Sequence, residues 1–271
     1  MTWERAVDHV AALATGGPLD PALRVTVHFH PDRIAGGEPI LAAMARDGVY
    51  RSQFETGTSN GGLTAFPGGD RWRWESRIFG GAYDAAASSA RPKYGSLNHR
   101  RRTEGGSPRF GSAHLRMRPT TLPRTTFCYP DSFLEPADFG VAARMSLIAL
   151  AEADEQDYLD DYIEAHVHGV VRFETDVEAL VLDPCYRGTA VEELAAALAC
   201  PLEWHQGFAL DVSEFARHPD YRGPEVIEAG LSIALDGRLD ARIIGTAVNA
   251  GTHDPQTLKR VWHHVARFGR P

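Results

Sequence analysis

The sequence has few cysteines: its 271 residues contain only three, Cys128, Cys185 and Cys200. No two of them share a CxxC spacing, which excludes a disulfide framework and a zinc knot built on cysteine pairs. No apolar run approaches the roughly 18 residues that a membrane-spanning helix needs. The segment 1–17, MTWERAVDHVAALATGG, is charged and amphipathic and lacks the apolar stretch of a signal peptide. We therefore expect a cytoplasmic protein that does not associate with membranes.

Several familiar ligand-binding loops are also absent from the sequence. It has no GK[ST] of a P-loop, no GxGxxG of a dinucleotide-binding turn and no DxDxDG of an EF-hand. The formal net charge is −8 at pH 7, so the molecule as a whole does not attract nucleic acid. This argues against a general DNA-binding module but is compatible with an enzyme that acts on nucleic acid.

The basic residues are unevenly distributed. One stretch of the chain is rich in them, and they are Arg91, Lys93, Arg100, Arg101, Arg102, Arg109, Arg116, Arg118 and Arg124. The acidic surplus lies further on, in the segments 152–164 and 211–228. The pattern predicts a local positive cleft in an acidic protein.

The length and the hydrophobic pattern favour a single domain over residues 1–271. We expect an N-terminal helix within 1–20, a sheet core that holds the site in 21–185, and a mostly helical part in 186–271. The strands predicted from β-branched and alternating residues are Leu23–His30, Tyr162–Phe173, Val177–Leu182 and Leu202–Val212. The helices predicted from period and end signals are 2–14, Glu38–Asp47, Ala137–Ala153, Val191–Ala199, Pro224–Leu235, Ala241–Ala250 and Pro255–Phe268. The fold class that we predict is α+β, with a split, twisted antiparallel sheet flanked by helices.

The segment from Tyr50 to Asp131 shows little long periodicity and is dense in Gly, Arg, Ser, Asn and aromatic residues. Long irregular stretches in compact domains are usually functional or disordered. The many aromatic residues argue against disorder. We therefore expect short strands joined by loops that bind a ligand.

Two short motifs place histidines on one face of a strand. The alternation of a strand puts both imidazoles of the HFH motif (residues 28–30) on the same side. The same alternation aligns Glu164, His166 and His168 in the motif YIEAHVHG. Three ionisable groups in a row are costly in a core, so we expect them to line a cleft. The alternative is a solvated strand face whose histidines only make hydrogen bonds.

Three loop segments have the composition of a polar binding site. The segment YRSQFETGTSNGG (50–62) combines hydroxyls, an amide and glycines, which suits a backbone pressed against a polar ligand. The segments RPKYGSLN (91–98) and SPRFGS (107–112) contain arginines, which bind phosphate or carboxylate through a bidentate fork. The aromatic ring of Tyr94 can stack on a planar ligand. Ordinary turns and solvated arginines are the alternative.

Taken together, VHFHPDR, YRSQFETGTSNGG, RWRWESRIFGGAYD, RPKYGSLN, PRFGSAHLRMR and YIEAHVHG resemble an uncharacterised bacterial family, a domain of unknown function. The resemblance extends from about Val25 to Phe268. More distantly, the order of elements is similar to that of ADP-ribosyltransferases of the DarT type, which modify DNA bases. That order is an early strand ending in histidine, a helix and turn, an aromatic-Arg segment and a glutamate on a late strand.

The second resemblance implies NAD as the substrate and no metal. The family's early histidine, which holds NAD, would correspond to His28 or His30, its arginine to Arg51, and its late catalytic glutamate to Glu164. From the alternation of the strand, and not from the resemblance, we expect His166 and His168 to support Glu164. Cleavage of the nicotinamide–ribose bond passes through an oxocarbenium-like state that one carboxylate can stabilise. The side chains expected to contact the nucleotide are Arg51, Gln53, Thr58, Ser59, Asn60, Arg91, Tyr94, Asn98, Arg109 and Ser112.

Two other functions remain open at this point. A metal-dependent hydrolase would use the histidine pairs at 28/30 and 166/168 as ligands. A catalytically silent ligand-binding protein, or a toxin–antitoxin partner, would need neither. In both enzyme hypotheses the strand Val25–His30 should neighbour the strand Tyr162–Val171, with the imidazoles on one face. The acceptor of a transferase, whether protein, nucleic acid or small molecule, is not indicated by the sequence.

Overall fold

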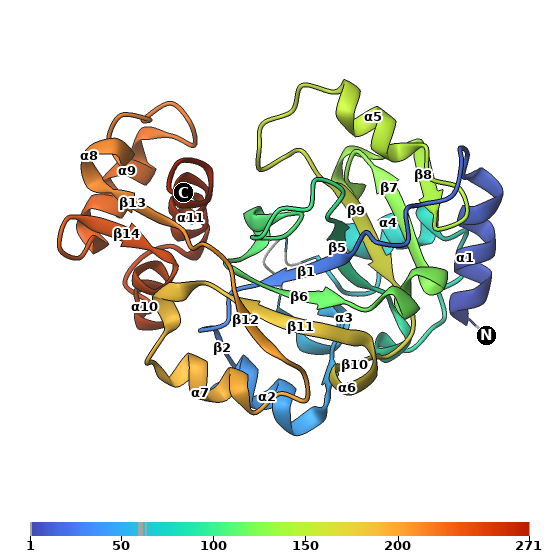
Figure 1. Ribbon diagram of the computed structural model, residues 1–271, viewed down its shortest axis with the longest axis horizontal. Helices are drawn as coiled ribbons and strands as arrows, with labels where there is room; N and C mark the ends of the chain where they lie inside the picture. The colour runs from blue at the N-terminus through green and yellow to red at the C-terminus, as the bar shows by residue number, and fades with distance from the viewer. Residues whose placement is uncertain (1, 59–61, 63, 271) are drawn as a thin grey trace.

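The structure is a computed structural model that describes residues 2–58, 62 and 64–270. Its centre is an eight-stranded sheet with the order β12-β11-β6-β1-β5-β9-β7-β8 (Figure 1). The bounds are β1 Val25–Phe29, β5 Lys93–Leu97, β6 Ala113–Met117, β7 Thr125–Tyr129, β8 Asp138–Val141, β9 Ile163–Val167, β11 Val177–Leu182 and β12 Leu202–Trp204. The pairing of β11 with β12 is parallel and the other neighbours in this sheet are antiparallel. The predicted α+β class with flanking helices is confirmed, and the sheet is mixed.

The sheet is split between β1 and β5. These strands pair only at Val25 with Leu97 and at Thr26 with Ser96. On its other side β1 pairs with β6 as far as Phe29, and β5 pairs with β9 from Lys93 onward. The two halves of the sheet are therefore joined at one end and separate at the other.

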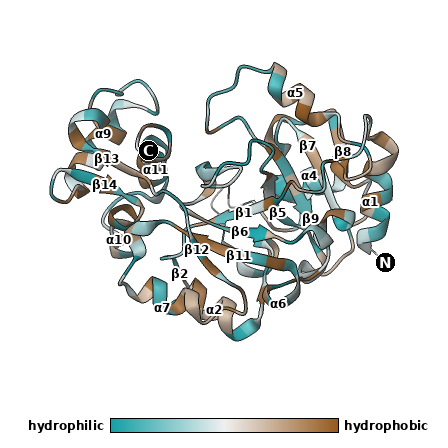
Figure 2. Ribbon diagram, in the orientation of Figure 1, coloured by the Kyte–Doolittle hydropathy of each residue, from teal (hydrophilic) through white to brown (hydrophobic). Residues whose placement is uncertain are grey.

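One face of the sheet is apolar because β-branched and aromatic residues alternate with polar ones along each strand. Val27, Phe29 and Ile163 belong to the main core cluster on that face. The helices α2 (Ile40–Asp47) and α7 (Ala190–Ala196) contribute Leu41 and Ala195 to the same cluster. Figure 2 shows hydrophobic residues on β11 and on these two helices beside it. The opposite face presents the polar residues that form the site.

The C-terminal part is mostly helical, as expected. It contains α8 (Val212–Phe215), α9 (Pro224–Ile233), α10 (Ala241–Ala250) and α11 (Pro255–Phe268), with a small hairpin of β13 (Ala209–Asp211) and β14 (Arg238–Asp240). These helices gather around a core cluster of their own that includes the fully buried Trp262. The indole nitrogen of Trp262 donates to the carbonyl of Pro108 at 2.9 Å, which ties α11 to a loop of the sheet.

At the other end of the molecule, α1 (Thr2–Leu13) packs with α4 (Asp70–Ile78) and β8. Val10, Phe79 and Tyr83 are buried in this third cluster.

The remaining helices are α3 (Gln53–Thr56), α5 (Leu147–Ala153) and α6 (Phe173–Asp176), with short 3-10 turns η1 (Ser88–Ala90), η2 (Pro108–Phe110), η3 (Pro119–Arg124), η4 (Ser132–Leu134) and η5 (Pro184–Tyr186). Short strands are β2 (Ile34–Ala35), β3 (Glu38–Pro39), β4 (Val49–Tyr50) and β10 (Val171–Arg172). Within the described residues no helix is both long and apolar enough to span a membrane.

Three sequence-based boundaries need correction. The helix predicted for Ala137–Ala153 is strand β8 followed by α5, because pairing with β7 outweighs the helical period. The strand predicted for Tyr162–Phe173 breaks at Gly169, whose φ of 75° suits glycine. The strand predicted for Leu202–Val212 is two strands, β12 and β13, in different sheets.

The predicted adjacency of β1 and β9 is wrong, because β5 lies between them. The predicted common face is nevertheless present. Thr26 is opposite Ser96, which is opposite Glu164, and cross-strand partners share a face. Two residues along β1, His28 lies on that same face.

Candidate functional site

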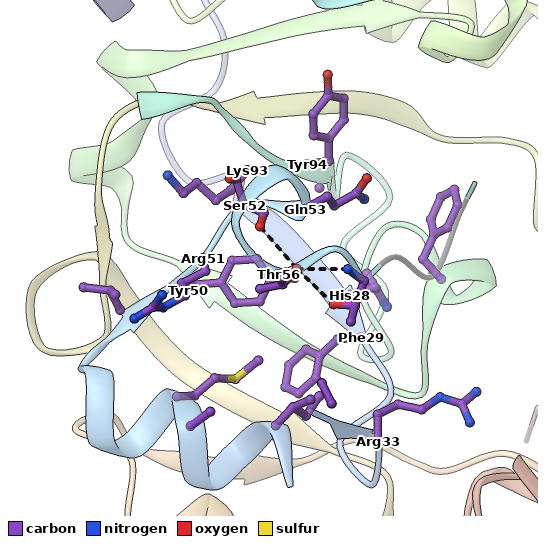
Figure 3. Close-up of a pocket in the computed structure, with 18 of the residues that line it drawn as sticks. His28, Phe29, Arg33, Tyr50, Arg51, Ser52, Gln53, Thr56, Lys93 and Tyr94 are labelled. Atoms are coloured by element: carbon purple, nitrogen blue, oxygen red, sulfur yellow. Dashed lines mark hydrogen bonds between the residues drawn. The ribbon is translucent and has the colours of Figure 1, made fainter. Parts of the chain in front are cut away.

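A cavity of about 300 Å³ occupies the opening between the two halves of the sheet. Its lining includes His28 and Phe29 of β1 and Lys93, Tyr94 and Gly95 of β5, in the parts of the two strands that do not pair with each other. Figure 3 shows labelled side chains from these strands, from β4 and from α3 around it. A Cβ on Gly95 would lie 2.5 Å from the carbonyl oxygen of Thr26, so glycine permits the close approach where the strands part.

Glu164 of β9 lines this cavity and is only 7% exposed. Its carboxylate accepts hydrogen bonds from Nε2 of His166 at 2.8 Å and from the hydroxyl of Ser132 at 3.1 Å. Burial alone would raise the pKa of the carboxyl, but the hydrogen bond from His166 and the nearby guanidinium of Arg71 hold that pKa below its ordinary value. Glu164 is therefore a buried, ionised carboxylate that faces a cavity.

The two histidines behind Glu164 belong to a continuous hydrogen-bond chain. The hydroxyl of Thr126 lies 3.2 Å from Nδ1 of His166 and 2.9 Å from Nε2 of His168. Nδ1 of His168 lies 2.6 Å from the hydroxyl of Tyr83. With both imidazoles neutral, each group donates to the next, from Tyr83 through His168, Thr126 and His166 to Glu164. Burial lowers the pKa of His168 well below its ordinary value, which agrees with this assignment.

The guanidinium of Arg71 lies in the same cavity and interacts electrostatically with Glu164. Arg71 of α4 lines the cavity, is 8% exposed, and lies 4.1 Å above the ring of Tyr94 and 5.1 Å from that of Trp74. Its Nε and Nη1 atoms are buried and make no hydrogen bond within the described part of the chain. A buried donor of this kind is rare unless a ligand or water completes it. In the sequence, the helical spacing of Arg71, Glu75 and Ile78 indicates that these side chains share one face of a helix. That face is buried in the structure.

Tyr94 is placed in the cavity as predicted, with its hydroxyl donating to Glu75 at 3.1 Å. Burial raises the pKa of Tyr94 well above its ordinary value, so the phenol stays neutral. Arg91, by contrast, does not reach the cavity. It is 3% exposed, pairs with the buried Glu75 at 2.5 Å and donates to the carbonyl of Tyr83. Its role in the structure is to hold α4 against β5.

The loop after α2 supplies one rim of the cavity. Arg51, Gln53 and Thr58 all line it, in agreement with the sequence. Arg51 is half-exposed and pairs with Asp47 at 2.9 Å. The side-chain oxygen of Gln53 is buried without a hydrogen-bond partner among the described residues. The predicted Ser59 and Asn60 lie outside the described residues.

The apolar wall of the cavity comes from α2, β4 and the end of β1. Phe29, Ile40, Met44 and Tyr50 lie on it. Burial raises the pKa of Tyr50 to about 12, so its hydroxyl is a neutral donor in the cavity. The cavity therefore combines guanidinium groups with an apolar wall, which is typical of a site for a ligand with both a ring and polar groups.

His28 lines the cavity, but its ring is already engaged. Nδ1 lies 3.1 Å from the carbonyl of Gly111, and Nε2 accepts from the backbone N–H of Ser107 at 3.3 Å. Burial lowers the pKa of His28 to about 4, so the ring is neutral. His30 does not line the cavity and packs against Trp262, with 5.2 Å between the ring centres. Strand β1 ends at Phe29, whose side chain belongs to the apolar core, so His30 already lies outside the sheet.

Three further predicted ligand contacts lie elsewhere. The side chain of Asn98 closes a turn with the backbone of Arg102, through bonds of 2.8 and 2.9 Å. Arg109 turns to the opposite side of η2 and pairs with Asp160. Ser112 is buried next to β6, and its carbonyl accepts from His205 at 2.7 Å. Composition marked these segments as polar, but Asn98 and Arg109 are engaged by other residues of the chain and Ser112 is buried away from the cavity.

The ligand set of the metal-hydrolase hypothesis is not assembled. Among the described residues, the donor atoms that lie within 4.8 Å of one another belong to Cys128, Glu164 and His166. His28 is separated from His166 by β5, and both nitrogens of His168 are hydrogen-bonded to Tyr83 and Thr126.

The fold and the site define a class: an α+β protein whose split sheet encloses a half-apolar cavity. The cavity contains a buried carboxylate and a guanidinium edge that has no hydrogen-bond partner among the described residues. The chain belongs to the family described as "Protein of unknown function (DUF3626)", whose sequence model matches residues 24–155 and 141–267. No curated protein matches the chain.

Proposed function

We propose that the protein is an NAD-dependent ADP-ribosyltransferase-like enzyme that cleaves the bond between nicotinamide and ribose. One observation supports this above others. His28, Arg51 and Glu164 come from three distant segments, yet all three line the one cavity at the split of the sheet. These are the positions at which the sequence resembles ADP-ribosyltransferases.

The chemistry of the reaction matches the side chains present. The C1′–N bond breaks with its electron pair leaving on nicotinamide, and positive charge develops on the ribose. Glu164 offers a buried negative charge whose orientation is fixed by His166 and Ser132 before any ligand binds. Preorganised charge of this kind stabilises a transition state because no solvent has to reorganise around it. Water or an acceptor then bonds to C1′ and gives up a proton.

Binding is divided between the two sides of the cavity. Tyr50 and Phe29 give flat apolar surface for a nicotinamide ring. Arg71 and Arg51 are the cations that would meet the pyrophosphate, and Arg71 has two donor atoms without partners in the described chain. A volume of about 300 Å³ is at the lower end of small-molecule sites. We assign the nicotinamide-ribose half of NAD to the enclosed part.

Thermal unfolding with NAD, together with measurement of released nicotinamide, tests the proposal. A ligand at about 100 times its dissociation constant stabilises the folded state by about 2.7 kcal/mol. We expect saturable stabilisation by NAD and slow release of nicotinamide, faster when the acceptor is supplied. Stabilisation without nicotinamide release would instead identify a silent nucleotide-binding protein. Absence of both effects at millimolar NAD would refute the proposal.

A further inference from the structure

A second pocket, of about 270 Å³, lies on the other side of η2 from the cavity and is lined by basic side chains. The turn η2 contributes Phe110 to the first cavity and Arg109 to this pocket. The rest of the lining comes from Arg222 and from one face of α11, with Gln256, Lys259, Arg260 and His263. The pocket therefore joins the sheet to the C-terminal helices.

Two guanidiniums of this pocket share one carboxylate. Asp160 accepts from Arg109, and its other oxygen lies 3.4 Å from Nη2 of Arg222. One carboxylate thus holds two guanidiniums side by side. Arg260 is paired with Glu225 at 2.6 Å. Burial and the positive charges of Arg109 and Arg222 lower the pKa of Lys259, as expected where cations crowd together.

Several polar atoms of the pocket point to a missing anion. The Nε atoms of Arg109 and Arg222 are buried and lack hydrogen-bond partners in the described chain. His263 is 3% exposed, lines the pocket, and neither of its ring nitrogens has a partner among the described residues. Such groups are costly to bury unless something completes them. An anion with several acceptor oxygens would satisfy the guanidinium edges and one imidazole N–H at once.

We propose that this pocket binds a phosphate group, of a monoester or of inorganic phosphate. Two arginines share one aspartate, which leaves room for an anion, and three or more oxygens match the forked donors better than a carboxylate does. The site is separate from the cavity that contains Glu164, so it does not depend on the proposed reaction. The pocket and the cavity lie on either side of η2. The pocket would hold the phosphate group of an acceptor or of a regulator next to the cavity.

Titration calorimetry with potassium phosphate, against potassium chloride at equal ionic strength, tests the proposal. We expect saturable binding at one site, at least tenfold weaker in Arg222→Gln and in Lys259→Gln. The matched control is Arg217→Gln, which removes the same charge from an exposed pair with Glu214 in the same part of the fold. An equal loss in Arg217→Gln, or no saturable binding of phosphate by the parent protein, would overturn the site. If Arg222→Gln does not fold by circular dichroism, Lys259→Gln decides the question.

Further ligands identify the source of the phosphate. Tighter binding of a 5′-phosphorylated dinucleotide than of its unphosphorylated form supports a site for phosphate on a nucleotide. Equal affinity for inorganic phosphate and for the phosphorylated dinucleotide supports a free anion. Binding of citrate as tight as that of phosphate would contradict the assigned class. Glu164→Gln should leave phosphate affinity unchanged, so failure of the NAD proposal and failure of this one are separable.

Discussion

Tyr83 and Glu164 lie at the two ends of one hydrogen-bond chain that runs through His168, Thr126 and His166. One set of imidazole tautomers lets every member of the chain donate in the same direction, toward the carboxylate. Chains of this kind polarise their members and fix their orientation. Glu164 is thereby presented to the cavity as an ionised group, although it is almost fully buried. The two histidines act on Glu164 and not directly on a ligand.

Replacement of Thr126 by valine should break this chain at its middle. The N–H of His168 and Nδ1 of His166 would both lose their partner, at a cost of about 1–3 kcal/mol for each unsatisfied group. We expect urea unfolding to show a loss of about 2–5 kcal/mol, within that estimate. The control is Thr125→Val, since Thr125 is equally buried but makes one hydrogen bond, to the carbonyl of Thr121. Equal losses in the two variants would show that the chain has no special role.

Glu164→Gln should remove activity while preserving the fold. The amide keeps the size of the side chain and its contact with the cavity but removes the negative charge. Loss of one preorganised electrostatic group lowers turnover by about 100-fold or more. Nicotinamide release at saturating NAD should fall by that factor, with the melting temperature nearly unchanged. Glu178→Gln, on β11 in the same sheet and outside the cavity, should keep parental turnover.

The sequence was sufficient to predict most of the longer helices, the strands β1 and β11, and one side of the site. Helices α10 and α11 match their predicted bounds because their ends have Asp240 and Asp254 as N-caps and glycine after the last residue. Period-two alternation placed Glu164 and His166 on one face. Sequence patterns do not report which strands are neighbours, so the insertion of β5 between β1 and β9 was missed.

Long-range partners account for the remaining errors. Arg91 and Arg71 are both in arginine-rich segments, and local composition does not distinguish them. Arg91 is paired with Glu75 of α4, whereas Arg71 of the same helix keeps two unpartnered nitrogens in the cavity, within the described chain. Only the packing of α4 on β5 decides which guanidinium is available to a ligand. The same applies to Arg109, which faces a different pocket.

Arg71 should therefore contribute to NAD binding and also to stability. Arg71→Met keeps the apolar stem on Tyr94 but removes the cation near the buried Glu164, so the free energy of unfolding should fall. The dissociation constant for NAD should rise at least tenfold, the loss of about 1.4 kcal/mol or more that a charged hydrogen bond represents. Arg71→Lys should restore only part of the affinity. The matched control is Arg73→Met on the exposed face of α4. Unchanged NAD affinity in Arg71→Met would remove this residue from the site.

Stability should fall as the pH drops below about 6.5, the ordinary pKa of histidine. Burial lowers the pKa of His28 to about 4 and that of His30, His114 and His168 well below the ordinary value. In the unfolded chain these rings take up protons near pH 6.5, whereas the folded state resists them. Above pH 6.5 the rings are neutral in both states and do not reduce the free energy of unfolding. This free energy falls as the pH drops from 6.5 toward 4, because protons then bind to the unfolded chain.

The change for His28 alone corresponds to about 3 kcal/mol. Glu75 acts in the opposite direction, because burial raises its pKa to about 7 and its contribution is lost as the pH rises toward that value. The measurement is the free energy of unfolding in urea at pH 7.5, 6.0 and 5.0. The four histidines should outweigh Glu75, so this free energy should fall as the pH is lowered. His28→Gln should flatten the acid limb, whereas His9→Gln, at an exposed position of α1, should not. A free energy that is constant across this range would contradict the assignment of neutral buried rings.

Chelators should leave both NAD binding and nicotinamide release unchanged. The group that comes nearest to a metal site within the described residues is Cys128, Glu164 and His166. Burial, with the charge of Glu164, raises the pKa of the Cys128 thiol well above its ordinary value, so the thiol is protonated and a poor ligand. The nitrogen of His166 nearest this group already donates to Glu164, and its other nitrogen faces Thr126. A metal would have to displace the thiol proton of Cys128 and the N–H proton of His166. It would also break the hydrogen-bond chain that starts at Tyr83.

Cys128→Ser separates the two cases without relying on chelation alone. In the metal-free site the serine hydroxyl replaces a thiol 4.0 Å from Glu164, so nicotinamide release should stay within about threefold of the parent value, a change under 1 kcal/mol. In a metal site, loss of the one sulfur ligand would abolish activity together with the bound ion. Elemental analysis of protein purified without nickel resin gives the independent measurement. Stoichiometric zinc, manganese or iron that is lost in Cys128→Ser would replace the transferase with a metal-dependent hydrolase built on Glu164 and His166.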